Sequence, residues 1–260
     1  MESFKNTFNE ITNDEKLASE LANKTIEYFS DMNKDAPTLT EVALFLSDEE
    51  IKQIVEEITK NEKWIEITQN PNKSEKIIEK IMDEHIFTSC SPDVALFGRM
   101  IANKQKWNVD AACQMAHAIS TNKIEQEMDY FIAMDDLKPV EMQGANMIGD
   151  ITYNSSCFYR FANINIDQLK NNLNNDNELT TNTLMAFIDA NIKALPLAKQ
   201  NSFAAFELPS LVMTIIKESR SPTSLMNAFV KPISPKRDSS IEEESIDALL
   251  NYKDKLNHMY

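Results

Sequence analysis

Apolar residues in the first part of the chain recur with the spacing of an α-helix. Between residues 17 and 29 they return every three or four positions, which predicts an amphipathic helix with one buried face. Two further stripes follow, and Ser47 and Glu50 precede the first of these with the spacing of a capping box. The side chains expected to face the core are Leu17, Leu21, Ile26, Phe29, Ile51, Ile54, Val55, Ile58, Ile77, Ile78 and Ile81. The pattern predicts a helical region over residues 1–90.

After residue 90 the period changes to two. In VDAACQMAHAIS, residues 109–120, the larger apolar side chains alternate with small or polar ones, which predicts a strand. His117 falls on its apolar face, where a buried core histidine is a better interpretation than a general base. The β-branched and aromatic residues of EMDYFIAM and ITYNSSCFYRFANINI predict strands as well. LPSLVMTIIKES, residues 208–219, is predicted as another short apolar strand.

Two helices are predicted among and after these strands. Residues 176–195 place Leu184, Phe187, Ile188 and Ile192 on one face, and Pro196 ends the pattern. Ser91 and Pro92 suit the start of an earlier helix, and Ser240 with Glu243 predicts a capping box for the last one. Helices come first and strands with an embedded helix follow, an order that predicts the α+β class.

Composition and charge narrow the function classes. A chain of 260 residues can form one large domain or two small ones. No apolar run approaches the roughly 20 residues of a bilayer span, and the first ten residues lack the features of a secretory signal. We therefore expect a cytoplasmic protein with no membrane partner. The net charge of −15 argues against simple electrostatic capture of nucleic acid, although KALPLAKQNSF, residues 193–203, carries lysines and no acid.

Most catalytic and metal-binding motifs are excluded. Three glycines cannot form a phosphate-binding GxGxxG or Walker A loop, and neither GxSxG nor HExxH occurs. The three cysteines and three histidines lack the spacing of metal ligands, so no cofactor or metal is predicted. Asp135 and Asp136 form the best acid pair. They either serve metal or acid–base chemistry or begin a turn, as aspartates commonly do.

Several segments, taken in order, carry a family resemblance. They are DVALFGRM, AHAISTNKIEQEMDYFIAMDDL, GANMIGDITYNSSCFYRFANINIDQL, AKQNSFAAF and SLMNAFVKP. Together they closely resemble the CasC (Cse-four) family, the multi-copy backbone subunit of type I-E CRISPR surveillance complexes, which are called Cascade. Looser similarity in residues 16–60 includes LFLSDEEI. The resemblance implies a hand-like subunit with helical fingers in residues 1–90, a modified RRM-like (ferredoxin-like) palm sheet in residues 91–235 and a C-terminal helix in residues 236–260.

The same resemblance implies a non-enzymatic role. Family members bind the guide crRNA without reading its sequence and polymerise along it, so the implied partners are crRNA, copies of the chain, other Cascade subunits and, through the guide, target DNA. The β-hairpin thumb, expected at about residues 128–153, interrupts the base stack of the neighbouring subunit's RNA. Replacing lost stacking by aromatic or apolar wedges offsets the cost of unstacking, and every base offers a π-face to such contacts.

The resemblance also implies which residues touch RNA. Tyr130, Phe131, Ile132 and Met134 match the family positions that pack against bases, and Met100 matches the palm residue that faces the same interruption. Tyr130 and Ile132 share one strand face, so packing within the hairpin is their alternative role, whereas Phe131 points the other way.

Three further residues are candidates for contact with the RNA backbone. Lys199 and Gln200 match a loop beside the guide, where they would contact phosphate or sugar. Arg160 either contacts phosphate or pairs with an acid.

The chain also departs from the family pattern. Family members begin with a palm strand and a basic, serine-containing segment that contacts the guide, and they continue beyond the point matched by LNHMY. We therefore expect a chain shortened at both ends, with an exposed strand edge and fewer phosphate contacts. Two alternatives stay open: metal-dependent RNA cleavage by Asp135 or Asp136 near the thumb, and an inactive fragment of the family.

Overall fold

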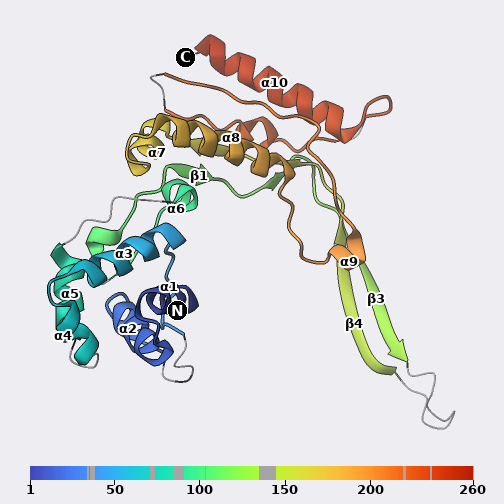
Figure 1. The fold of residues 1–260 in the computed structure, drawn as a ribbon. Coiled ribbons are helices and arrows are strands. Elements are labelled where there is room, and N and C mark those ends of the chain that lie inside the picture. Colours follow the sequence, from blue (N-terminus) through green and yellow to red (C-terminus); the bar gives the residue numbers. More distant parts are fainter. Residues whose placement is uncertain are drawn as a thin grey trace, which may run out of the picture. The chain divides into compact units, whose positions relative to one another are not determined.

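The computed structural model divides the chain into two compact units. Residues 1–114 and 164–208 form the first unit, and residues 115–163 and 209–260 form the second. Figure 1 colours both by position in the sequence. The structure describes residues 1–33, 35, 39–70, 74–84, 91–102, 104–134, 145–218, 221–234 and 236–259. Each unit is described by itself.

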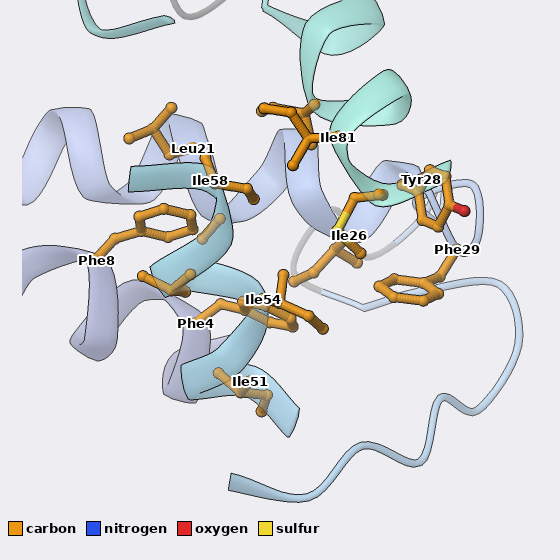
Figure 2. Close-up of a cluster of buried hydrophobic side chains, with 14 of the residues drawn as sticks. Phe4, Phe8, Leu21, Ile26, Tyr28, Phe29, Ile51, Ile54, Ile58 and Ile81 are labelled. Carbon is orange, nitrogen blue, oxygen red and sulfur yellow. The ribbon is translucent and has the colours of Figure 1, made fainter. Parts of the chain in front are cut away.

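The first unit opens with helices packed around one apolar core. The helices are α1 (Glu2–Thr12), α2 (Glu15–Glu27), α3 (Asp48–Lys60), α4 (Trp64–Gln69) and α5 (Glu75–Glu84). The predicted apolar stripes meet in this core, where Leu17 and Ile77 are partly buried and the other predicted residues are buried. Figure 2 shows that Phe4 and Phe8 of α1 join them, facing Ile54 and Ile58 of α3. The helices predicted from the three apolar stripes are confirmed as α2, α3 and α5.

The start of α3 confirms the predicted capping box. The Ser47 hydroxyl accepts a hydrogen bond from the Glu50 amide at 3.1 Å, and the Glu50 carboxylate accepts one from the Ser47 amide at 2.9 Å. Two amides that would otherwise lack partners at the helix N-terminus are thereby satisfied. Asp14 caps α2 in a similar way by accepting from the amides of Lys16 and Leu17.

The rest of the first unit contains the helical elements α6 (Pro92–Phe97), η2 (Gln105–Trp107), α7 (Ile166–Asn172), α8 (Asn177–Lys193) and α9 (Gln200–Phe203). Trp107 of η2 belongs to the first core, whereas α6, α7 and α8 meet in a second, smaller cluster. Leu96 of α6 packs with Leu169 and Leu173, and Phe187 of α8 lies against them. Ser91 occupies the N-cap of α6 and Pro92 its first turn, as predicted, although the Ser91 hydroxyl donates to the Asp93 carboxylate instead of capping an amide.

The predicted strand over residues 109–120 is wrong in most of its length. Only β1 (Cys113–Met115) and β2 (Ile119–Ser120) are strands, and they belong to separate two-stranded ladders with β6 (Ala162–Ile164) and β5 (Phe158–Tyr159). Since the chain changes ladders between them, one uninterrupted alternation of buried and exposed faces is not possible. His117 lies in this connection and is exposed, so its predicted burial is also wrong.

The second unit contains one long hairpin and a helix-covered apolar cluster. The hairpin pairs β3 (Gln126–Met134) with β4 (Ala145–Asn154) in antiparallel fashion. The cluster contains Phe229 of η4 (Met226–Phe229), Leu249 of α10 (Ile241–Met259) and Leu225. The predicted capping box of α10 is present, since Ser240 and Glu243 exchange hydrogen bonds between side chains and amides.

The predicted strand over residues 208–219 is not observed in the described residues. Positions 208–218 form no strand, although Met213 packs against the apolar cluster of the second unit. A strand requires hydrogen bonds to a neighbouring strand, and no described segment supplies them to this stretch. The prediction was wrong because composition reports β propensity without reporting whether a partner strand is in reach.

Helices and small antiparallel ladders together confirm the α+β class. The division of the chain at residues 90 and 235 stays a prediction, as does the RRM-like palm. No described helix is long and apolar enough to cross a lipid bilayer.

Candidate nucleic-acid interface

The register of the β3–β4 hairpin determines which side chains share a face. Tyr130 pairs with Asp150, Phe131 with Gly149 and Ile132 with Ile148. Residues directly opposite each other in an antiparallel pair project to the same side, and neighbours along a strand project to opposite sides. Tyr130 and Ile132 therefore lie on one face with Ile148, and Phe131 lies on the other. The register changes at an irregularity between Ala133 and Met134.

The face that carries Tyr130 presents large apolar side chains to solvent. Tyr130 is 75% exposed, Ile132 56% and Ile148 68%, and Met128 on the same face is 73% exposed. These side chains form no hairpin core among the described residues, since a side chain packed in a core is buried. The face offers apolar and aromatic surface that nothing in the described chain covers. Its contact with RNA stays a prediction.

The opposite face holds Phe131 against a glycine. A Cβ atom placed on Gly149 would lie 2.6 Å from Cζ and 2.8 Å from Cε1 of the Phe131 ring, so the ring occupies the space that any other residue would fill. An aromatic ring that covers the glycine opposite it is a known way to stabilise a strand pair. Phe131 stays 38% exposed and therefore keeps part of its ring available to a ligand.

The charges of the hairpin strands are all negative. Glu127 and Asp129 lie in β3 and Asp150 in β4, and neither strand contains a lysine or an arginine. Phosphate binding depends chiefly on cationic side chains. The described strands therefore suit contact with the faces of bases or with apolar groups, and they do not suit contact with a phosphate backbone.

Met100, in the first unit, is 83% exposed between two fixed residues. Arg99 and Val109 exchange backbone hydrogen bonds of 2.9 Å in both directions, and the amide of Ile101 donates to Oδ1 of Asn108 at 2.6 Å. Ile101 is buried. Because both neighbours are held, the backbone of Met100 has little freedom while its side chain points into solvent.

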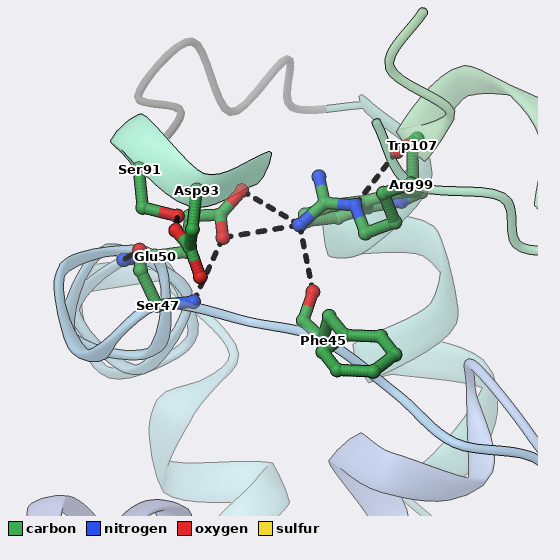
Figure 3. Close-up of polar contacts among 7 residues, drawn as sticks. All are labelled: Phe45, Ser47, Glu50, Ser91, Asp93, Arg99 and Trp107. Carbon is green, nitrogen blue, oxygen red and sulfur yellow. Dashed lines mark hydrogen bonds and ion pairs between the residues drawn. The ribbon is translucent and has the colours of Figure 1, made fainter. Parts of the chain in front are cut away.

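Arg99 is held by a buried network, drawn in Figure 3. Its Nη1 donates to both carboxylate oxygens of Glu50, at 2.9 and 3.0 Å, and to the carbonyl of Phe45 at 3.0 Å. Its Nε donates to the carbonyl of Trp107 at 2.9 Å. The side chains of Arg99 and Glu50 are 5% and 1% exposed. The sequence predicted the cap role of Glu50, but nothing in the local pattern indicated its partner 49 positions away.

Lys199 and Gln200 lie together at the start of α9, where Lys199 is the N-cap residue with a left-handed backbone, φ 61°. Nε2 of Gln200 donates to the carbonyl of Pro196 at 2.7 Å and so ties the beginning of the loop to the helix. Lys199 is exposed. The geometry leaves the lysine ammonium open to an anionic ligand and engages the glutamine amide within the loop, and RNA contact by either residue stays a prediction.

The remaining predicted residues are only partly described. Arg160 lies between β5 and β6 and is exposed, and Met134 ends β3 with its side chain outside the described part. Asp135 and Asp136 lie outside the described residues altogether. Within the described ranges, no three histidine, cysteine, aspartate or glutamate side chains are grouped so that they could hold a metal ion.

Residues 1–260 match the model of one family, described as "CT1975-like protein". No curated protein matches the chain.

Solved structures with a similar fold include two CRISPR surveillance complexes. One, titled "CRISPR RNA-guided surveillance complex, pre-nicking", is 25% identical with a TM-score of 0.77, and the match covers 98% of this chain and 71% of that chain. The other, titled "CRISPR RNA-guided surveillance complex", is 31% identical with a TM-score of 0.59, and it covers 65% of this chain and 64% of that chain.

Proposed function

The chain belongs to the CT1975-like protein family, and on this premise we propose that it is a non-catalytic, crRNA-binding backbone subunit of a type I-E Cascade complex. In this role the chain holds the guide without reading its sequence, contacts further copies of itself and other subunits along the guide, and leaves target recognition to base pairing. An RRM-like palm, helical fingers and a hairpin thumb are the proposed parts. Both similar structures are CRISPR RNA-guided surveillance complexes, which supports this assignment.

The observation that carries the proposal is the β3–β4 hairpin, with exposed apolar and aromatic side chains on both faces. An isolated hairpin that leaves Tyr130, Ile132 and Ile148 in water gains nothing from them. Stacking on a base removes this surface from water and contributes about 1–3 kcal/mol per base for an aromatic side chain. Since all four bases have a π-face, such contacts tolerate any guide sequence.

The distribution of charge supports contacts with bases and with phosphates by different surfaces of the chain. The only charged side chains of the hairpin strands are acidic, so phosphate contacts are assigned to other residues. Lys199 is the first candidate, because its ammonium group is exposed. Arg160 is a second candidate. Met100 is proposed to contact a base, because it is exposed and apolar while its backbone is fixed. Phe131 contributes the exposed part of its ring from the other hairpin face.

The test is a co-expression pull-down that separates these two kinds of contact. The tagged chain is expressed with a guide RNA and the other type I-E subunits, and the retained RNA is measured as salt is raised. Tyr130→Ala is expected to weaken retention by about 1–3 kcal/mol at every salt concentration. Lys199→Ala is expected to lower the slope of log affinity against log salt by about 0.7, the value for one phosphate contact on a single strand.

Thr152→Ala is the matched control, since Thr152 lies on the Tyr130 face of the hairpin, opposite Met128, and offers no ring. It should leave retention unchanged. If well-folded wild-type chain retains no RNA of discrete length, or if Tyr130→Ala behaves like Thr152→Ala, the assignment of the hairpin to RNA is wrong.

A further inference from the structure

We propose that the buried pair of Arg99 and Glu50 positions Met100 for its contact with RNA, so that Arg99 and Asn108 are positioning residues for a contact that they do not make themselves. The inference rests on the proposed function, because it names residues that act through one of its contacts. It follows from three observations on the first unit.

The first observation is that burying the Arg99–Glu50 pair costs desolvation free energy. Both side chains are almost fully buried, and removing two charges from water offsets most of their attraction. Apolar residues of similar volume often stabilise a fold as well as such a pair does or better. What the pair supplies is direction, since the planar guanidinium forms bonds only along fixed N–H vectors. Here those bonds end on Glu50 and on the carbonyls of Phe45 and Trp107.

The second observation is that Glu50 is itself held in place. Its carboxylate accepts from the Ser47 amide in the capping box while it accepts from Arg99, as Figure 3 shows. The N-terminus of α3, the carbonyl of Phe45 and η2 are therefore joined through one guanidinium. A shift of Arg99 would break bonds to all three at once.

The third observation is that this rigidity ends on an exposed apolar side chain. Gly98 takes φ +78°, and a Cβ atom there would lie 2.8 Å from the carbonyl oxygen of Val109, so the backbone before Arg99 lies close against the segment of Val109 and leaves no space for a side chain. On the other side, Asn108 holds the amide of Ile101. Met100 therefore combines a fixed backbone with a flexible thioether in solvent. A preorganised backbone lowers the entropy lost on binding, and methionine adapts to irregular apolar surfaces such as a base edge.

The alternative is that the pair only joins α3 to the segment after α6, and a double-mutant cycle distinguishes the two roles. Four complexes are assembled on the tagged chain with guide RNA and the other subunits: wild type, Arg99→Lys, Met100→Ala and the double variant. Arg99→Lys keeps the positive charge and loses the rigid, planar arrangement of N–H donors. Each single variant is expected to weaken RNA affinity about five- to tenfold, and the double variant is expected to be no weaker than Met100→Ala alone.

Asn108→Ala repeats the cycle from the other side and guards against misfolding of Arg99→Lys, because Asn108 is exposed and its loss removes one bond to Ile101. It should lose its effect on affinity in the Met100→Ala background too. Ile78→Val is the matched control: it removes one buried methyl group from the core of the same unit, outside the hydrogen-bond network of Arg99, and it should lower stability without changing affinity.

Independent, multiplying effects of Arg99→Lys and Met100→Ala would overturn the positioning role, as would unchanged affinity in a folded Arg99→Lys chain. Failure of the proposed function has a different signature. In that case Tyr130→Ala and Met100→Ala both leave RNA retention at the wild-type level, whereas failure of the positioning role alone leaves the Tyr130→Ala effect intact.

Discussion

The two capping boxes of the chain allow a matched test of what burial adds to one carboxylate. Glu50 and Glu243 occupy the same position, three residues after a serine N-cap, and each accepts a hydrogen bond of 2.9 Å from that serine's amide. They differ in their surroundings. Glu50 is 1% exposed and paired with Arg99, whereas Glu243 is exposed and forms no ion pair with another described residue. Substitution by glutamine removes the charge from both and keeps their size and capping oxygen.

The expected cost of the two substitutions follows from this difference. Glu50→Gln leaves the Arg99 guanidinium buried without a counter-charge, and breaking a buried pair in this way costs about 3–5 kcal/mol. Glutamine retains one oxygen for Arg99, so we expect a loss near the lower end, about 3 kcal/mol. Glu243→Gln changes an exposed residue and is expected to cost no more than about 0.5 kcal/mol. With a urea m-value of about 2 kcal/mol/M, the midpoints should fall by about 1.5 M and at most about 0.3 M.

Urea unfolding should be followed by tryptophan fluorescence and by far-ultraviolet circular dichroism. Both tryptophans, Trp64 and Trp107, lie in or against the core of the first unit, so fluorescence reports on the unit that holds Glu50. Dichroism also includes α10, where Glu243 lies. If Glu50→Gln costs as little as Glu243→Gln, the buried guanidinium of Arg99 does not need the charge of Glu50, and the cost inferred from its burial is refuted. If Glu243→Gln costs as much as Glu50→Gln, the carboxylate charge at the helix N-terminus, and not the pair with Arg99, explains both losses.

Three further changes test other parts of the structure. Gly149→Ala is expected to displace the Phe131 ring, since the new Cβ atom would lie 2.6 Å from it. The ring resonances of labelled phenylalanine should shift in Gly149→Ala and stay unchanged in Thr152→Ala, the control on the same strand. The Tyr28 hydroxyl, which donates to Asp83 at 2.6 Å, holds the pKa of that carboxyl below its usual value. Asp83→Asn should therefore lower the melting temperature above about pH 4 and lose this effect as pH falls through the lowered pKa. Ile54→Ala should cost about 2–5 kcal/mol in urea unfolding, because Ile54 is fully buried.

Part of the candidate interface could be predicted from sequence, because it depends on family resemblance and strand alternation. The family resemblance is confirmed by the family match. Alternation along EMDYFIAM correctly separated Tyr130 and Ile132 from Phe131, since neighbouring positions of a strand face opposite sides. It did not show that Phe131 covers Gly149, because the register depends on how the two strands meet across the loop between them. The hydrogen-bond network around Arg99 was not predicted either, because its partners are distant from Arg99 in the sequence.

The sequence by itself determined three helices of the first unit, α2, α3 and α5, with their buried stripes, and the capping boxes at Ser47 and Ser240, because periodicity and caps depend on residues a few positions apart. Only the tertiary structure decided which strand segments have partners. It left residues 208–218 unpaired, divided the predicted strand at residues 109–120 between two ladders, and joined Glu50 to Arg99 across 49 positions. Strand pairing and buried charge pairs require groups that are distant in the chain to meet in space, and no local pattern encodes that meeting.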